Sequence, residues 1–183
     1  MSIALSSTDS ALVARIRRAI RDIPGFPAPG ILFRDVTPML GDGQLFREVT
    51  DAMAAPFLHA SITHVAGVES RGFILGAPVA QALGVGFIPI RKKGKLPGPT
   101  VARRYGLEYG ADVLEMHCDA CPRGSRVLIV DDVLATGGTA AASAELVQEV
   151  SASVTGFSFL AALDALKGEA RLEHFDVRTL LRL

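Results

Sequence analysis

The segment Val127–Thr139, VLIVDDVLATGGT, combines residue types that could bind a phosphorylated sugar. Its apolar run ends in two adjacent carboxylates, Asp131 and Asp132, which can accept hydrogen bonds from the vicinal hydroxyls of a ribose. Successive backbone N–H groups, two glycines and two hydroxyls then begin a predicted helix, where positive partial charge favours an anion. We therefore predict a ribose 5-phosphate site at Asp131 and Asp132 together with Val133, Leu134, Ala135, Thr136, Gly137, Gly138 and Thr139.

The common nucleotide-binding loops do not match this chain. A P-loop needs a glycine, four residues and then Gly-Lys-Ser/Thr, whereas Gly94-Lys95 is followed by Leu96 and is preceded by Pro89 at the first glycine position. No GxGxxG motif follows a predicted strand either. A strand end, a turn and a helix cap would each explain part of Val127–Thr139, and only their combination indicates a monophosphate site.

An alternation of strands and helices must position these residues. Apolar runs predict strands over 62–68, 85–90, 126–132 and 154–163, and helical periodicity predicts helices over 72–83 and 138–150. Strands that are apolar throughout are typical of a mostly parallel sheet flanked by helices on both faces. We therefore predict an α/β fold of the doubly wound class, with the C-terminal VRTLLRL as an edge strand and the ligand at the carboxyl ends of the strands.

The remaining segments are less regular. Apolar residues at helical spacing predict an amphipathic helix from Leu12 to Ile23, ended by Pro24 and Gly25. The Pro- and Gly-rich segment 26–38 is expected to be an ordered loop or a short strand, followed by a helix over 44–59. The basic stretch 91–106 is too long for a routine connection and is expected to be a mobile loop, before a strand over 107–116.

Length and charge limit the possible functions. The chain has 183 residues, which indicates one domain, and its 19 acidic and 19 basic residues balance. The balance gives no support for a nucleic-acid or membrane partner, and no apolar run approaches a bilayer span. Without a secretory signal the expected location is the cytoplasm. Cys118 and Cys121 form a CxxC, which we interpret as a connector turn rather than a redox or zinc motif.

The segment VLIVDDVLATGGT resembles the phosphoribosyl pyrophosphate motif of the type I phosphoribosyltransferases. Three further segments resemble the adenine-specific branch of that family: FPAPGILFRDVTP, GVESRGFILGAPVA, and IRKKGKLPGPT running into YGLEYG. The resemblance implies the type I phosphoribosyltransferase fold in a single domain over residues 1–183. It also implies a small N-terminal hood at about 23–40 and a flexible catalytic loop at about 92–108.

The resemblance assigns base recognition to the hood, at Leu32, Phe33 and Arg34. In the family an aromatic ring stacks on adenine while backbone groups read its edge. Backbone reading is physically reasonable, because adenine presents an amino donor beside a ring-nitrogen acceptor and hypoxanthine reverses that pattern. A site whose buried polar groups stay unpaired with the wrong base can reject it by about 10⁴-fold or more. From the residues alone, Phe33 would be interpreted as a core aromatic, and only the surrounding motif assigns it to the base.

The resemblance places pyrophosphate near Arg71, Arg91, Lys92 and Lys95, with Arg91 and Lys95 as the first choices within the basic run. Arg71 alone could be a solvated residue at a helix start, and Glu69 could be structural. Tyr105 is expected to close over the site, and Glu108 corresponds to the family's loop carboxylate that approaches N7 of adenine. The same resemblance implies Mg²⁺ held mainly by substrate oxygens, and a homodimer in which a neighbouring subunit approaches the pyrophosphate.

The predicted reaction transfers the 5-phosphoribosyl group from phosphoribosyl pyrophosphate to adenine and gives AMP and pyrophosphate, as in purine salvage. Glu108, Asp131 and Asp132 are the predicted catalytic residues. One alternative is a phosphoribosyltransferase for hypoxanthine, guanine or xanthine, against which the hood segment argues. Another is a phosphoribosyl pyrophosphate-sensing regulator that binds nucleic acid, which would need an additional DNA-binding segment or a basic face.

Overall fold

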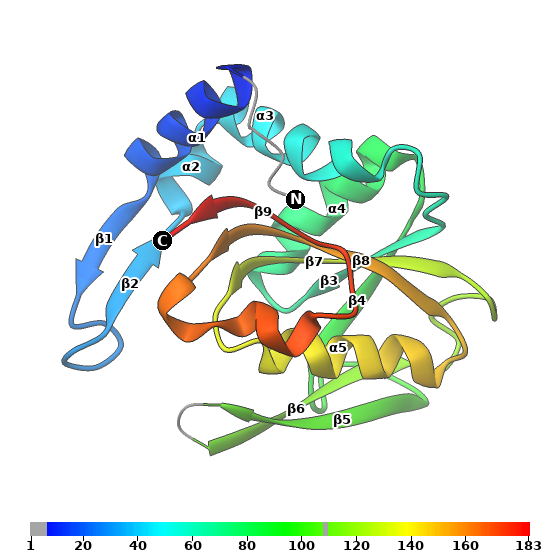
Figure 1. Cartoon of the computed structure of the whole chain (residues 1–183). Coiled ribbons are helices and arrows are strands. Elements are labelled where there is room, and N and C mark those ends of the chain that lie inside the picture. The colour runs from blue at the N-terminus through cyan, green and yellow to red at the C-terminus, as the bar shows by residue number, and fades with distance from the viewer. Residues whose placement is uncertain (1–6, 108–109) are drawn as a thin grey trace. The chain divides into compact units, whose positions relative to one another are not determined.

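The computed structural model describes residues 7–107 and 110–183 (Figure 1). The described residues group into two compact units, one within Met1–Asp51 and the other Ala52–Leu183. None of the helices within residues 7–107 and 110–183 has the length and apolarity needed to cross a bilayer.

The first unit contains helices α1 (Ser7–Ala19) and α2 (Thr37–Gly41), a hairpin of strands β1 (Arg21–Pro24) and β2 (Leu32–Asp35), and most of helix α3 (Gly43–Ala54). The prediction that the first helix continues to Ile23 is wrong. Instead, Ile23 pairs with Phe33 across the hairpin, and Arg21 Nη2 lies 2.5 Å from the carboxylate of Asp35. Pairing with a distant segment has overridden the local helical periodicity.

The helix predicted over 44–59 is also shorter in the structure. It begins at Gly43, and the carboxylate of Asp42 accepts hydrogen bonds from the N–H groups of Gln44 and Leu45 at 3.1 and 3.0 Å, which caps its first turn. At Ala55 the helix gives way to the 3₁₀ turn η1 (Ala55–Phe57). Pro56 explains the change, because proline has no N–H for an α-helical hydrogen bond.

The second unit is built on a seven-stranded sheet in the order β5-β6-β4-β3-β7-β8-β9 (Figure 1). Parallel pairing joins β4 (Gly86–Lys92), β3 (His64–Val68), β7 (Arg126–Leu134), β8 (Ser153–Ala162) and β9 (Val177–Arg182). The predicted α/β class, a mostly parallel sheet flanked by helices, is therefore confirmed. The C-terminal strand β9 is the edge strand expected for VRTLLRL.

The other edge of the sheet differs from the prediction. Residues 100–107, expected within a mobile loop, form strand β5 (Thr100–Leu107), which pairs antiparallel with β6 (Gly110–His117) along its whole length. β6 in turn pairs antiparallel with β4. The Pro- and Gly-rich composition concealed β5, because its regularity comes from pairing with β6 rather than from an apolar run of its own.

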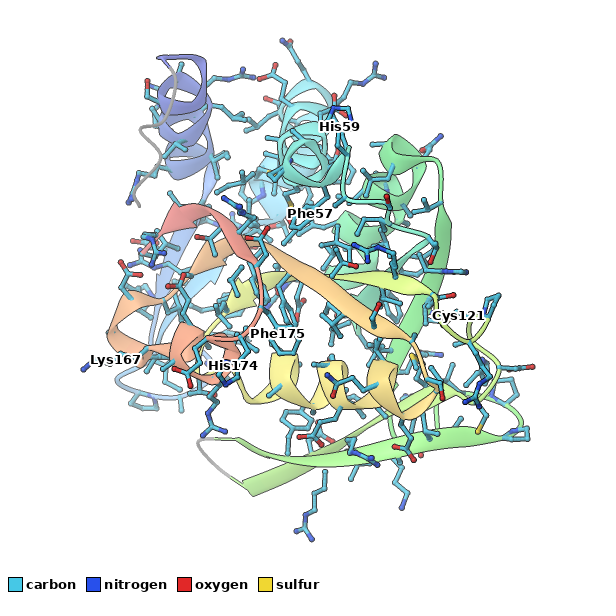
Figure 2. All side chains as sticks on the ribbon, turned by 45° about the vertical axis from the view of Figure 1, so that its right-hand side comes forward. Phe57, His59, Cys121, Lys167, His174 and Phe175 are labelled. Atoms are coloured by element: carbon cyan, nitrogen blue, oxygen red, sulfur yellow. The ribbon has the colours of Figure 1, made fainter. Side chains whose placement is uncertain are left out.

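Helices α4 (Arg71–Leu83) and α5 (Gly138–Glu149) cover opposite faces of the sheet. α5 packs on Val127, Ile129 and Phe157, whereas Gly76 of α4 approaches Val130 on the other face. The remaining connections are the 3₁₀ turns η2 (Asp164–Leu166) and η3 (Gly168–Leu172). In Figure 2, Phe175 points into the interior, where its ring meets that of Phe157 edge-on, and Lys167 points outward.

Gly72 allows the first turn of α4 to contact the end of β7. A Cβ atom at this position would lie 2.9 Å from both the Val130 carbonyl oxygen and Asp131 Oδ1. Neither atom belongs to a long flexible side chain, so a methyl group here must separate the helix from the strand.

We expect Gly72→Ala to destabilise the fold by about 1–3 kcal/mol, the usual cost of overpacking. Gly43→Ala is the matched control, because nothing lies within 4 Å of a Cβ there. Thermal unfolding gives the melting temperature of each variant. Equal melting temperatures for G72A, G43A and the wild type would contradict this packing.

Candidate active site

Two carboxylates meet at the carboxyl end of β7. Asp132 is 5% exposed, and its carboxylate accepts a short hydrogen bond from Nε of Arg71 in the first turn of α4. Asp131 is partly buried, and its Oδ1 accepts the backbone N–H of Asp132 at 2.9 Å. The structure thus brings together Arg71, Asp131 and Asp132, which the sequence separates into two segments.

Burial and charge act on Asp131 in the same direction. Loss of solvent raises the pKa of Asp131 well above its usual value, and the neighbouring Asp132 carboxylate raises it further. The Asp132 N–H and the Arg71 guanidinium oppose this shift of the Asp131 pKa without reversing it. A carboxyl group kept poised in this way can respond strongly when a ligand brings hydroxyl donors or positive charge to it.

The predicted phosphate cradle lies between β7 and α5. Gly137 adopts a φ of 79°, which places it in the left-handed region that favours glycine, and it directly precedes the first residue of α5. The next residues present their N–H groups at the N-terminus of a twelve-residue helix, the arrangement that suits an anion. The geometry of this turn is therefore compatible with an anion.

Gly168 supports this cradle and was not predicted from the sequence. A Cβ atom on Gly137 would lie 2.5 Å from the Gly168 carbonyl oxygen, and one on Gly168 would collide with the Ala135 carbonyl. The backbones of η3 and of the cradle are thus packed directly against each other. Because the contact joins segments far apart in the chain, no local pattern around Gly168 marks it.

Two adjoining cavities, together called the cleft, are lined by most of the predicted residues of this unit. One cavity of about 350 Å³ lies at the cradle, and a second of about 630 Å³ extends past the carboxylates. They share Asp131, Val133, Ala135 and Thr139 in their walls. The first is also lined by Leu134, Thr136, Gly137 and Gly138, and the second by Glu69, Ser70, Arg71, Lys92, Lys95, Tyr105 and Asp132.

Basic side chains line the second cavity. Lys92 and Lys95 line it, and Nζ of Lys92 lies 3.1 Å from the Asp112 carboxylate. The hydrogen bond and charge of Asp112 raise the pKa of Lys92. Arg91 is placed differently: its Nε lies 3.1 Å from the Glu69 carboxylate and its Nη1 donates to the Lys95 carbonyl at 3.0 Å.

Glu69 connects these basic residues to the start of α4. Its carboxylate accepts the Lys92 backbone N–H at 3.2 Å as well as the Arg91 guanidinium. Partial burial alone would raise the pKa of Glu69, but these two donors and the charge of Lys95 lower it overall. Glu69 thus stays ionised and holds the basic strand end beside the cleft.

Tyr105 reaches the cleft from β5. Its ring would lie 3.6 Å from a Cβ atom on Gly138 at the start of α5, and burial is the main reason that the pKa of Tyr105 is raised. Closure of Tyr105 over the cradle stays a prediction. Glu108, predicted as the loop carboxylate, lies outside the described residues.

The hairpin of the first unit carries the predicted base-binding residues. Phe33 packs edge-on against Phe26 with ring centroids 5.1 Å apart, Leu32 is exposed, and Arg34 Nη1 lies 2.5 Å from the Asp22 carboxylate. Gly25 donates to the Ile31 carbonyl at 2.7 Å. Along antiparallel strands, hydrogen-bonded residue pairs alternate with pairs that are not hydrogen-bonded. Because Gly25 and Ile31 form a hydrogen-bonded pair, the backbone groups of Leu32 and Arg34 point away from β1.

Asp35 fixes the end of this hairpin. The Thr37 N–H donates to its carboxylate at 2.9 Å and Arg21 donates from the opposite strand. The Thr37 backbone hydrogen bond, and then the Arg21 side chain, lower the pKa of Asp35 to about 2. The ionised carboxylate thereby joins the two strands to the start of α2.

Cys118 and Cys121 lie in the turn after β6, as expected for a connector, and both thiols are free. Across the described part of the chain, no group of three or more His, Cys, Asp or Glu side chains is arranged to hold a metal ion.

The comparisons with known proteins agree with this geometry. The model of the phosphoribosyl transferase domain family matches residues 39–181. An adenine phosphoribosyltransferase of Myxococcus xanthus is 56% identical over 176 residues, covering 96% of each chain. The chain belongs to the adenine phosphoribosyltransferase family.

Solved adenine phosphoribosyltransferases share the fold. The crystal structure from Rhodothermus marinus has a TM-score of 0.91 at 50% identity and covers 95% of this chain and 99% of its own. That of Trypanosoma brucei, solved with AMP, pyrophosphate and ribose-5-phosphate, has a TM-score of 0.87 at 29% identity and covers 98% and 82%. The cleft thus belongs to an adenine phosphoribosyltransferase fold.

The raised pKa of Asp131 predicts a pH-dependent cost in stability. Between the unfolded pKa, about 3.9, and the higher folded pKa, the folded state binds more protons, so the free energy of unfolding falls as pH rises. Asp131→Asn cannot lose a proton and escapes this cost. We expect D131N to gain stability relative to the wild type from pH 4 to pH 7, with a melting temperature about 2–8 °C higher at pH 7.

The same D131N variant should lose at least about tenfold in turnover, since the carboxylate faces the cleft. Asp119→Asn, at an exposed position of the turn after β6, removes an equal charge and is the control. Thermal melts across the pH range measure the difference. Melting curves of D131N that run parallel to those of the wild type from pH 4 to pH 7 would contradict the proposed burial cost.

Proposed function

We propose that the cleft of the second unit binds phosphoribosyl pyrophosphate and that the chain transfers its 5-phosphoribosyl group to adenine, giving AMP and pyrophosphate. The observation that carries the proposal is the set of groups that line the two cavities. The anion cradle lines the first cavity, Arg71, Lys92 and Lys95 line the second, and Asp131 lines both. This set of groups suits a 5-phosphate, a ribose and a pyrophosphate.

The cradle from Ala135 to Thr139 holds the 5-phosphate through backbone N–H groups and the hydroxyls of Thr136 and Thr139. Asp131 and Asp132 accept hydrogen bonds from the ribose hydroxyls. Arg71, Lys92 and Lys95 donate to the pyrophosphate oxygens, and Arg71 links the two halves because it also holds Asp132. Arg91 acts through Glu69, which fixes the basic strand end.

The reaction is an in-line displacement at the anomeric carbon. The bond to pyrophosphate breaks as N9 of adenine attacks the opposite face, and positive charge develops on the ribose ring. The nearby carboxylates of Asp131 and Asp132 stabilise that charge, while the basic side chains stabilise the leaving pyrophosphate. Tyr105, packed over the cradle, helps to exclude water that would hydrolyse the activated ribose.

Mg²⁺ is the expected cofactor. When bound to pyrophosphate and ribose oxygens it neutralises the leaving group. The acidic pair at Asp131 and Asp132 is compatible with such an ion, because Mg²⁺ keeps several waters and uses few protein ligands. These carboxylates would hold it through the ribose hydroxyls and bound water.

The hairpin of the first unit recognises the base. The outward N–H and C=O groups of Arg34 read the adenine edge, Phe33 supplies an aromatic surface, and Leu32 supplies an apolar one. Glu108 approaches N7 of adenine and accepts its proton as N9 becomes the nucleophile. Adenine is preferred over hypoxanthine because the donor and acceptor positions of its edge are reversed relative to that base.

We assign residues 1–183 to one phosphoribosyltransferase domain, with the hood at about 23–40 and a catalytic segment at about 92–108 that includes β5. The working form is a cytoplasmic homodimer in which the basic segment of one subunit approaches the pyrophosphate of its neighbour. The cluster of basic residues at the end of β4, in a chain without net charge, supports this arrangement.

Incubation with Mg²⁺, phosphoribosyl pyrophosphate and each nucleobase in turn tests the activity, with the nucleotide identified by chromatography. We expect AMP from adenine and less than about one part in 10⁴ of that rate with hypoxanthine or guanine. The double variant D131N/D132N is the control and should lose most of this activity while staying folded. IMP or GMP formed at comparable rates, or AMP synthesis unchanged in the double variant, would refute the assignment.

A further inference from the structure

Strand β5 has two distinct faces. Along it, Val101, Arg103 and Tyr105 are partly buried, whereas Ala102, Arg104 and Gly106 are exposed. Val101 and Tyr105 pack against the core cluster that includes α5, and Figure 1 shows the β5–β6 hairpin lying along that helix. Because side chains alternate across a strand, Arg103 lies on the face that meets α5.

Arg103 joins two acidic residues of α5. Its Nε lies 3.2 Å from the Glu145 carboxylate and its Nη1 lies 2.5 Å from that of Glu149. Without a cation this arrangement would be unfavourable on two counts. Like charges four residues apart on a helix repel, and carboxylates near a helix C-terminus oppose the helix dipole. Arg103 relieves both effects.

The same face of β5 contacts the other end of α5. A Cβ atom on Gly138, the first residue of α5, would lie 3.0 Å from the Gly106 carbonyl oxygen and 3.6 Å from the ring of Tyr105. β5 therefore runs along α5 from the cradle to the C-terminal turn of the helix. Its full-length pairing with β6 makes it one stiff element.

A stiff strand held at one point keeps its register elsewhere. Arg103 and Tyr105 are two residues apart, about 7 Å along a strand. A slip of β5 that broke the Arg103 contacts would therefore also move Tyr105 away from the start of α5 and the cradle. Conversely, contacts of Arg103 with Glu145 and Glu149 favour the register in which Tyr105 covers the cradle.

We propose that Arg103 is a positioning residue that anchors β5 along α5 and so holds Tyr105 over the phosphate cradle. The inference rests on the proposed binding of phosphoribosyl pyrophosphate in the cleft. Arg103 touches no part of that cleft, and its effect passes through the strand.

The expected effect is modest because the ion pairs are partly exposed. Loss of the anchor should raise the KM for phosphoribosyl pyrophosphate about two- to tenfold, which corresponds to about 0.4–1.4 kcal/mol. Turnover at saturation should change less than KM, since bound substrate favours the register of β5 in which Tyr105 covers the cradle. The effect should also shrink at 500 mM NaCl, where the screening length is about 4 Å.

The test compares Arg103→Gln with Arg104→Gln, which removes the same charge from the exposed face of the neighbouring residue. AMP synthesis gives kcat and KM at 50 and 500 mM NaCl, and hydrogen exchange reports the opening of residues 101–106. We expect R103Q, relative to R104Q, to show the higher KM at low salt and faster exchange in β5. Exchange in β7 and the melting temperature should be close to those of the wild type.

A charge reversal separates positioning from a general loss of structure. Arg103→Glu should raise KM more than R103Q, and adding Glu149→Arg should bring KM back toward the wild-type value. Equal KM and exchange in R103Q and R104Q, or no recovery in R103E/E149R, would overturn the proposal. Absence of AMP synthesis in the wild type would instead refute the proposed function, while the exchange comparison would still report on the anchor.

Discussion

The adjacent carboxylates at the end of β7 are the constraint on which the rest of the second unit depends. Burying two like charges side by side is unfavourable, and the raised pKa of Asp131 expresses that cost. Arg71 offsets part of it by donating to Asp132. The guanidinium can reach this position only because α4 begins directly against β7, a contact that Gly72 makes possible.

Other elements meet at the same strand end for related steric reasons. α5 begins three residues beyond β7 through the left-handed Gly137, and η3 supports that turn by backbone contact at Gly168. β5 covers the turn from the side through Tyr105. The carboxyl end of one central strand thus gathers an acidic pair, an anion cradle and a basic rim within one cleft, as expected for ligand sites in open α/β sheets.

Features encoded within short segments were predictable from the sequence. The continuous apolar pattern of β7 and the small residues that follow it predicted the strand, the cradle and the helix, because each depends on neighbouring residues. β1 and β5 were missed, since each is a strand only by virtue of its partner. Gly168 and the ion pairs of Arg103 were equally inaccessible, because the contacting groups are tens of residues away. The pairing of Arg91 with Glu69 likewise depends on where β4 ends beside α4.

The most direct test of the account is whether the two halves of the cleft bind the two halves of the substrate independently. Calorimetry would measure the affinities for ribose 5-phosphate and for magnesium pyrophosphate in two variants, Thr136→Val at the cradle and Lys95→Gln in the second cavity. We predict that T136V weakens ribose 5-phosphate about fivefold, the loss of one hydrogen bond, and leaves pyrophosphate within twofold of the wild type. K95Q should weaken pyrophosphate binding and leave ribose 5-phosphate binding within twofold of the wild type. Equal weakening of both ligands by either variant would contradict the assignment of a phosphate end and a pyrophosphate end.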